Sequence, residues 1–276
     1  MEITVECEDG REAHHAIHVA FESIARVQTL MSFHDLGSEI SELNRLAFFQ
    51  NVAVSPETYE VLKRAKKLYE YTDGIFDITI AAELMDWDLL PRHSFLSQTD
   101  FSGRTKDIEL LPNRQVHFLR PLCIDLGGIA KGFAVDRAIQ VLQERDMQSA
   151  IVNAGGDIRC FGNQERPIWV RDPQLAGQFL SLPALKNAAL ATSANSYDKL
   201  RRDSRICPHV HGQTRKPLPS PSSVSVRADS CMMADALTKV VIALGKDSGE
   251  ILSHFNAVAF IAGHDGRMIC YGGRQS

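Results

Sequence analysis

Helical and strand-like hydrophobic patterns follow one another irregularly along this chain, and this order is the strongest constraint on its fold. From Arg11 to Met31 the apolar residues recur every three or four positions, which is typical of one amphipathic helix with a core-facing stripe. Further helical patterns and short apolar runs follow, without the regular strand–helix–strand alternation of a doubly wound parallel sheet. The sequence therefore predicts an α+β fold.

Capping and turn signals place the other elements. Ser55 and Pro56 start a helix, because Ser can cap it and Pro suits its first turn, and Gly245 ends another. We expect residues 92–116 to form a loop or hairpin, and residues 203–222 are the most loop-like stretch. We predict helices over 38–44, 55–71, 132–145 and 233–244, and strands over 3–7, 116–119, 122–126, 150–153, 158–161, 168–171, 179–182, 188–192, 223–227, 257–261 and 268–271.

Composition narrows the class of protein. The chain has 276 residues, 44% of them hydrophobic, and a net charge of −4 with both signs interspersed, which argues against a nucleic-acid partner. No run approaches the roughly 20 apolar residues of a membrane-spanning helix, and the N-terminus lacks the apolar segment of a secretory signal. The six cysteines form no CxxC pair, which indicates buried thiols in a reducing compartment. We therefore expect a single cytoplasmic domain over residues 1–276.

The segment DLGGIAKGFAVD, from Asp125 to Asp136, is the strongest candidate for a ligand loop. Its two glycines precede a helix, so the backbone can approach a ligand closely and helical N–H groups can face an anion. Lys131 adds a point charge. The spacing is neither that of a Walker loop nor that of the GxGxxG dinucleotide fingerprint. On these residues alone, a structural glycine turn is an equal alternative to a phosphate site.

Four other segments are weak signals one by one. A glycine pair follows Asn153, and Asp77 and Thr79 alternate with apolar residues, so an inward polar group there needs a partner or a ligand. A polar cluster occupies 191–197. Asp235 lies near a helix start, where the dipole favours a carboxylate, which can also be a metal ligand.

Together and in order, these segments resemble the ApbE family, the FAD:protein FMN transferases, from about Thr4 to Tyr271. Phe133 replaces the family's Tyr and Ala194 its Gly. The family elements SEISxLN, GxFDITV, DLGGIAKGYAVD, NAGGDIRxxG, TSG and VSVxAxxxMxADALST are similar to Ser38–Asn44, Gly74–Ile80, Asp125–Asp136, Asn153–Gly162, Thr192–Ser193 and Val224–Thr238.

The resemblance implies an α+β, T-fold-related architecture of mixed sheets flanked by helices, with a cleft for FAD. It implies transfer of the FMN half of FAD to a Thr or Ser hydroxyl of an acceptor protein, with release of AMP and with Mg²⁺ at the pyrophosphate. The metal ligands it implies are the carbonyl of Gly128, Asp235 and Thr238. The cofactor-binding residues it implies are His34, Ile75, Phe76, Asp77, Asp125, Lys131, Thr192 and Ser193.

The chain departs from the family pattern in two places. Lys239 stands where the family has a metal-binding Thr, four residues after Asp235 and so on the same helix face. Its ammonium would compete with a divalent cation or replace part of its charge. Alternatively, Lys239 points away and Thr238 or water serves instead.

The second departure concerns the family's HxxDPxTG segment, which supplies the candidate base. Here the stretch from Cys207 to Arg215 holds His209 and His211 but no Asp-Pro. Either histidine suits a base near neutral pH, and either can be an ordinary loop residue. Three functions stay open on this reading: an active FMN transferase, an FAD-binding paralogue that transfers nothing and acts as a carrier or regulator, and an enzyme that hydrolyses FAD to FMN and AMP.

Overall fold

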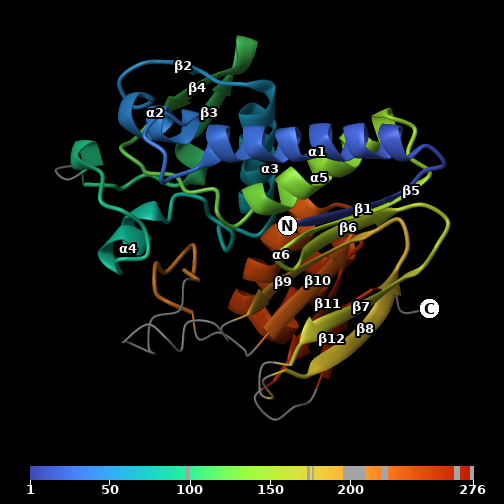
Figure 1. The fold of residues 1–276 in the computed structure, drawn as a ribbon. Coiled ribbons are helices and arrows are strands. Elements are labelled where there is room, and N and C mark those ends of the chain that lie inside the picture. Colours follow the sequence, from blue (N-terminus) through green and yellow to red (C-terminus); the bar gives the residue numbers. More distant parts are fainter. Residues whose placement is uncertain are drawn as a thin grey trace. The chain divides into compact units, whose positions relative to one another are not determined.

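The structure is a computed structural model whose described residues form two compact units (Figure 1). Unit 1 consists of Met1–Ala25, Lys131–Ser204 and Pro219–Ser276, and unit 2 of Arg26–Ala130 and Arg205–Leu218. The described residues are 1–96, 100–172, 175, 177–194, 209–218, 223–263 and 268–273. The expectation of a single domain stays a prediction.

Unit 1 is built on a seven-stranded sheet with the order β1-β5-β6-β9-β10-β11-β12. The helix α1 (Gly10–Met31) contributes its first residues to this unit and the rest to unit 2. The strands are β1 (Glu2–Glu6), β5 (Ser149–Ala154), β6 (Asp157–Phe161), β9 (Ala189–Ala194), β10 (Ser223–Ala228), β11 (Val258–Ala262) and β12 (Met268–Gly272), and the helices are α5 (Ala130–Glu144), α6 (Cys231–Leu244) and α7 (Gly249–His254).

A two-stranded ribbon, β7 (Arg166–Arg171) and β8 (Phe179–Leu185), completes unit 1 (Figure 1). Its inner face buries Ile168 and Leu182, which pair across the ribbon and pack with Ile158 and Leu190 of the large sheet. Its outer face leaves Trp169 exposed. The alternation of buried and exposed residues is that of a strand pair with one face on the core.

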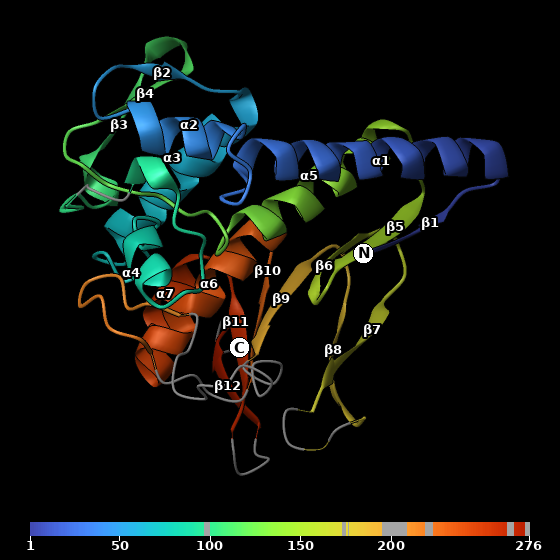
Figure 2. The ribbon, with the colours of Figure 1, turned by 60° about the vertical axis from the view of Figure 1, so that its left-hand side comes forward.

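Helix α6 lies against β9 and β10 of the sheet (Figure 2). Ser230 caps it, since its hydroxyl accepts a hydrogen bond from the Met233 amide. Asp136 of α5 supports the same helix end, because its carboxylate accepts the amides of Cys231 at 2.8 Å and Met232 at 2.9 Å. The last residue of the DLGGIAKGFAVD segment therefore holds the helix that carries Asp235.

Unit 2 contains several helices and a three-stranded sheet with the order β2-β4-β3. Phe33, Met85 and Leu96 belong to its core. The segment 209–218 belongs to this unit as well, and the single bridge Val210–Pro217 is its regular pairing. The elements are α2 (Glu39–Leu46), β2 (Val52–Ala53), α3 (Pro56–Tyr71), α4 (Ala81–Asp86), β3 (Ile108–Leu111) and β4 (Gln115–Phe118).

The α+β fold class and the five long or capped helices are confirmed, with ends within two residues of the prediction. The predicted strand over 122–126 is wrong. There the amide and carbonyl of Ile124 pair with the side chain of Asn44 at 2.8 and 2.9 Å, so these groups bond to a side chain rather than to a neighbouring strand. Every pairing between described strands is antiparallel, so these sheets are antiparallel rather than mixed.

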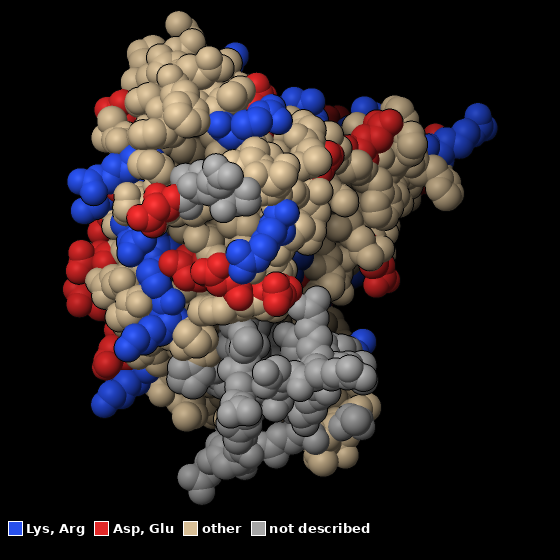
Figure 3. Space-filling model, turned by 90° about the vertical axis from the view of Figure 1, so that its left-hand side faces the viewer, with Lys and Arg blue, Asp and Glu red and all other residues tan. Residues whose placement is uncertain are grey.

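The described part of the chain contains no helix that combines the length and the apolar character needed to cross a membrane. Three described cysteines, Cys123, Cys160 and Cys231, are buried free thiols as expected, whereas Cys270 is exposed. On the face shown in Figure 3, Lys and Arg side chains are interspersed with Asp and Glu side chains.

Candidate functional site

Two buried carboxylates and two lysines form the most polar cluster of unit 1. Asp157 begins β6 and Asp235 lies in the second turn of α6, and each is 1% exposed. Lys131 Nζ lies 3.0 Å from Asp157 Oδ2. Lys239 Nζ forms an ion pair with Asp235 Oδ1. Of the two alternatives for Lys239, the structure therefore shows contact with Asp235, so this side chain does not point away.

The first turn of α5 brings backbone donors to the same cluster. The amide of Gly132 donates to Asp235 Oδ2 at 3.2 Å, as expected for a carboxylate at a helix N-terminus. Only glycine fits at this position, because a Cβ there would lie 2.3 Å from the carbonyl oxygen of Cys231. The glycine of the AKG sequence thus allows α5 and α6 to approach closely enough for the contact.

Hydroxyl groups line the other side of Lys239. Thr238 Oγ1 donates to the main-chain oxygen of Asp235 at 2.7 Å and lies 2.9 Å from Ser193 Oγ. Lys239 Nζ donates to Ser193 Oγ at 3.4 Å. The structure therefore brings together four residues predicted from the sequence: Lys131, Ser193, Asp235 and Thr238. Thr192, also predicted, pairs instead with Ser225 Oγ at 2.9 Å.

Burial and mutual repulsion make Asp157 the electrostatically strained member of the cluster. Desolvation, and then the charge of Asp235, raise its pKa from 3.8 to about 6, although Lys131 and Lys239 oppose the rise. Apart from its ion pair, neither oxygen of Asp157 has a hydrogen-bond partner among the described residues. Burial pulls the pKa of Lys131 down, but Asp157 and Asp235 outweigh burial and raise it. Such strain is common at binding and catalytic sites.

The Asp157→Asn variant tests this strain. Between about pH 4 and 6 the folded protein keeps a proton on Asp157 that the unfolded chain has lost, so this group stabilises the fold at low pH and ceases to do so as pH rises. Relative to the parent, the variant should therefore gain free energy of unfolding across that window, by up to about 3 kcal/mol. Urea unfolding of both proteins from pH 4 to 8 measures the gain, with the exposed Asp247→Asn as reference. A difference in unfolding free energy that does not vary with pH would contradict the raised pKa of Asp157.

A groove of about 750 Å³ in unit 1 adjoins the same strands. Asn153 Oδ1 accepts the Gly156 amide at 3.0 Å and closes the turn after β5, where Gly155 and Gly156 have φ of +66° and +103° that favour glycine. The volume is in the range of small-molecule sites. The groove is lined by Met1, Glu2, Asn153, Gly155, Gly156, Ile158, Trp169, Val170, Arg171, Phe179, Leu190, Thr192 and Ser223.

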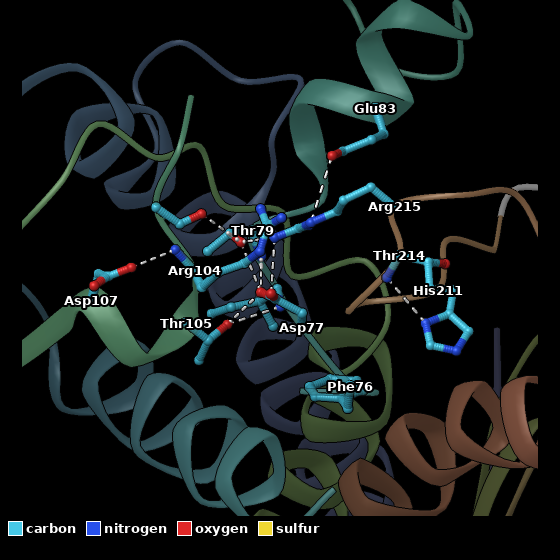
Figure 4. A network of polar contacts seen from close by, with 12 residues as sticks. Phe76, Asp77, Thr79, Glu83, Arg104, Thr105, Asp107, His211, Thr214 and Arg215 are labelled. Atoms are coloured by element: carbon cyan, nitrogen blue, oxygen red, sulfur yellow. Dashed lines mark hydrogen bonds and ion pairs between the residues drawn. The ribbon is translucent and has the colours of Figure 1, made fainter. Parts of the chain in front are cut away.

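In unit 2, Asp77 is the centre of a second buried network (Figure 4). Its Oδ1 accepts from the amide and the hydroxyl of Thr79, both at 2.8 Å, and from Thr105 Oγ1 at 2.7 Å. Its Oδ2 accepts from Arg215 Nη2 at 2.9 Å. The sequence predicted that an inward polar group here needs a partner or a ligand. In the structure, protein groups are the partners of Asp77. These groups use both oxygens of the carboxylate, and its assignment to FAD binding stays a prediction.

The other predicted ligand residues of unit 2 lie in varied settings. His34 is exposed in the turn after α1, and Phe76, drawn in Figure 4, is buried. Ile75 is half-buried, and its carbonyl accepts the Gly212 amide at 3.3 Å. Asp125 Oδ2 accepts the Gly127 amide at 3.1 Å, so this carboxylate shapes its own turn. Gly128 follows in that turn, and its carbonyl as a metal ligand stays a prediction.

The two candidate bases belong to unit 2, and Cys207 and Pro208 before them lie outside the described residues. His211 Nδ1 accepts the Thr214 amide at 3.4 Å, so in this arrangement a neutral ring carries its proton on Nε2 (Figure 4). The carbonyl of His209 accepts the Leu218 amide at 2.8 Å. Which histidine acts as base stays a prediction.

The residues around Asp235 do not fit a divalent cation. The two carboxylates here are each already paired with a lysine ammonium. Mg²⁺ prefers an octahedron of oxygens, whereas the oxygen that it would take at Asp235 is in contact with Lys239.

Sequence reasoning missed Asp157, Arg215 and Thr105. Asp157 had a signal, because it ends the glycine turn of NAGGD, directly before an apolar strand. No local signal pointed to Arg215 or Thr105. Arg215 is 138 residues from its partner Asp77 in the sequence, and Thr105 is 28 residues from it.

The chain is similar in sequence to known proteins. The profile of the ApbE family matches residues 1–261. A protein of Vibrio cholerae named FAD:protein FMN transferase is 27% identical over 252 residues, which cover 85% of this chain and 75% of that protein. One of Haemophilus influenzae with the same name is 26% identical over 88% of this chain and 76% of its own length.

Solved structures show the same fold. The ApbE protein from Thermotoga maritima superposes with a TM-score of 0.79 and 26% identity, over 97% of this chain and 91% of that one. The flavin transferase ApbE from Vibrio cholerae superposes with a TM-score of 0.77 and 24% identity, over 99% of this chain and 93% of that one.

Proposed function

Because this chain belongs to the ApbE family, we propose that it transfers the FMN half of FAD to a Thr or Ser hydroxyl of an acceptor protein and releases AMP. The relatives named above carry that activity in their names. One observation on this chain supports the proposal: Lys131 and Lys239 are paired with two buried carboxylates, Asp157 and Asp235, whose charges influence one another beside the first turn of α5. Ammonium groups and helical amides are the groups that bind phosphate.

The reaction sets clear demands on the site. The acceptor hydroxyl oxygen forms a bond to the FMN phosphorus, the anhydride bond to the AMP phosphate breaks, and AMP leaves with the electron pair of that bond. The hydroxyl proton goes to a base, for which His209 and His211 are the candidates. Negative charge grows on the leaving phosphate, and positive groups already in place there lower the barrier most effectively.

The chain's own residues meet these demands in named roles. Lys131 and Lys239 bind the pyrophosphate, and Asp157 and Asp235 hold the two lysines in position. Ser193 and Thr192 donate hydroxyl hydrogen bonds at the phosphate or ribose. The assignment of Phe76, Ile75, His34, Asp125 and Asp77 to FAD binding stays a prediction. The Mg²⁺ that the resemblance implies has no step in this proposal, because the residues do not fit it.

Incubation of the protein with FAD and an acceptor domain that bears a Thr-containing flavinylation motif tests the proposal. Transfer predicts a fluorescent acceptor band on a denaturing gel and AMP in the supernatant. The matched control is the same acceptor with its target Thr replaced by Val, which should stay dark. AMP without labelled acceptor would indicate hydrolysis of FAD instead, and FAD binding without AMP would indicate a carrier. Either outcome contradicts the proposal.

A further inference from the structure

The ammonium of Lys239 is surrounded by oxygen atoms of the kinds that bind cations. It contacts the carboxylate of Asp235, the main-chain oxygen of Asp235 at 3.2 Å and the hydroxyl of Ser193 at 3.4 Å. Carboxylate, carbonyl and hydroxyl oxygens are the ligand types that hard divalent cations take. An ammonium has three donors and no acceptor, so these oxygens satisfy it fully.

The cluster is neutral with its lysines in place. Asp157 and Asp235 carry two negative charges, and Lys131 and Lys239 two positive ones, so the sum is zero. A divalent ion at Asp235 would raise the net charge of the cluster, counted without FAD, from zero to +2. It would also lie in contact with the Lys239 ammonium, and in a buried site that repulsion is only weakly screened.

Lys239 has little freedom to leave this setting. It follows Asp235 by one helical turn on α6, and its side chain is 23% exposed. Departure would leave the carboxylate of Asp235, which is 1% exposed, with the Gly132 amide as its one hydrogen-bond donor among the residues that the structure describes. Removing one partner of a buried ion pair is strongly unfavourable.

We propose that Lys239 itself supplies the positive charge at the pyrophosphate, so that this chain binds FAD and transfers FMN without a divalent metal. On binding, the ammonium keeps its bond to Asp235 and donates to a phosphate oxygen in place of the Ser193 hydroxyl, its longest contact. It then stabilises the charge that grows on the leaving AMP phosphate. This inference rests on the proposed function and names the cation of the same site.

The first test compares the intact protein with and without metal. FAD affinity is measured by quenching of flavin fluorescence, and transfer by AMP release, after dialysis against EDTA and again with added Mg²⁺. We expect the affinity and the rate to change by less than about twofold. A loss of about tenfold or more in EDTA that Mg²⁺ restores would overturn the inference and leave the transferase proposal standing. Absence of FAD binding in both conditions would overturn both.

The second test compares a variant that removes the positive charge of Lys239 with one that keeps it. In EDTA, Lys239→Thr should weaken FAD binding by about tenfold or more, and Mg²⁺ should restore much of the loss because Asp235 is then free to hold it. Lys239→Arg keeps the charge and should stay independent of metal. The control is Lys246→Thr, an exposed lysine just beyond the same helix, which should behave as the parent. Equal affinity of Lys239→Thr and Lys246→Thr in EDTA would contradict the role of Lys239, and circular dichroism verifies that each variant is folded.

Discussion

Replacement of Asp235 by Asn is expected to lower the rate of FMN transfer by about 100-fold or more while the protein stays folded. Asp235 is a positioning residue: its Oδ1 holds the Lys239 ammonium, and its Oδ2 accepts the Gly132 amide at 3.2 Å. Asn has nearly the same shape and still accepts from that amide, but it lacks the charge that fixes the ammonium. The lysine then loses its place beside the leaving phosphate.

The measurement separates positioning from structure. Initial rates at saturating FAD give kcat, and fluorescence titration gives the affinity for FAD. We expect kcat to fall further than the affinity, because charge on the leaving phosphate grows only in the transition state. The exposed Asp247→Asn on the same unit is the matched control and should retain the parent rate. A variant that unfolds at lower temperature but keeps its kcat when folded would show that Asp235 serves stability alone.

Replacement of Arg215 by Met is expected to cost about 3–5 kcal/mol of unfolding free energy. The Arg215 side chain is 11% exposed and that of Asp77 is fully buried, so truncation leaves a carboxylate without its countercharge. Arg215 Nη2 also donates to Thr79 Oγ1 at 2.7 Å, and Arg215 Nε lies 3.6 Å from Glu83 Oε1 (Figure 4). Burial lowers the pKa of Arg215, and Asp77 and Glu83 oppose that change.

A double variant makes this prediction sharper. Asp77→Asn combined with Arg215→Met removes both charges, so it should recover a large part of the loss, as buried pairs replaced together often do. The control Lys216→Met alters the next, exposed residue and should change stability by less than about 0.5 kcal/mol. Urea unfolding of the four proteins measures the effects. Equal losses in the single and double variants would show that Arg215 acts through packing rather than charge.

Local signals in the sequence predicted most elements of this fold. The helix over Pro56–Tyr71 follows from Ser55, whose hydroxyl accepts the Thr58 amide, and from a regular apolar stripe. Such information lies within a few residues of the helix itself. The strand expected over 122–126 failed because its backbone pairs with Asn44, 80 residues away, and no local pattern announces a side chain that substitutes for a neighbouring strand.

Some residues of the candidate site could likewise be predicted from the sequence, and others could not. Lys131, Ser193, Asp235 and Thr238 were predicted through their resemblance to a family, and the structure gathers them in unit 1. Asp157 was missed as a charge partner, because its proximity to Lys131 depends on how β6 lies beside α5. The zero net charge of the cluster follows from how these residues are arranged in the fold. From the sequence position of Lys239 alone, contact with Asp235 and a side chain that points away were equally open.

A single-turnover experiment tests whether this chain transfers FMN from FAD to the hydroxyl of an acceptor protein. With FAD limiting and the acceptor domain in excess, intact mass spectrometry counts acceptor that has gained FMN, and chromatography counts AMP. We expect equal amounts of FMN-bearing acceptor and AMP, at equal rates, with the label on the Thr or Ser of the motif. AMP formed in excess of labelled acceptor, or neither product while FAD stays bound, would contradict the proposed transfer.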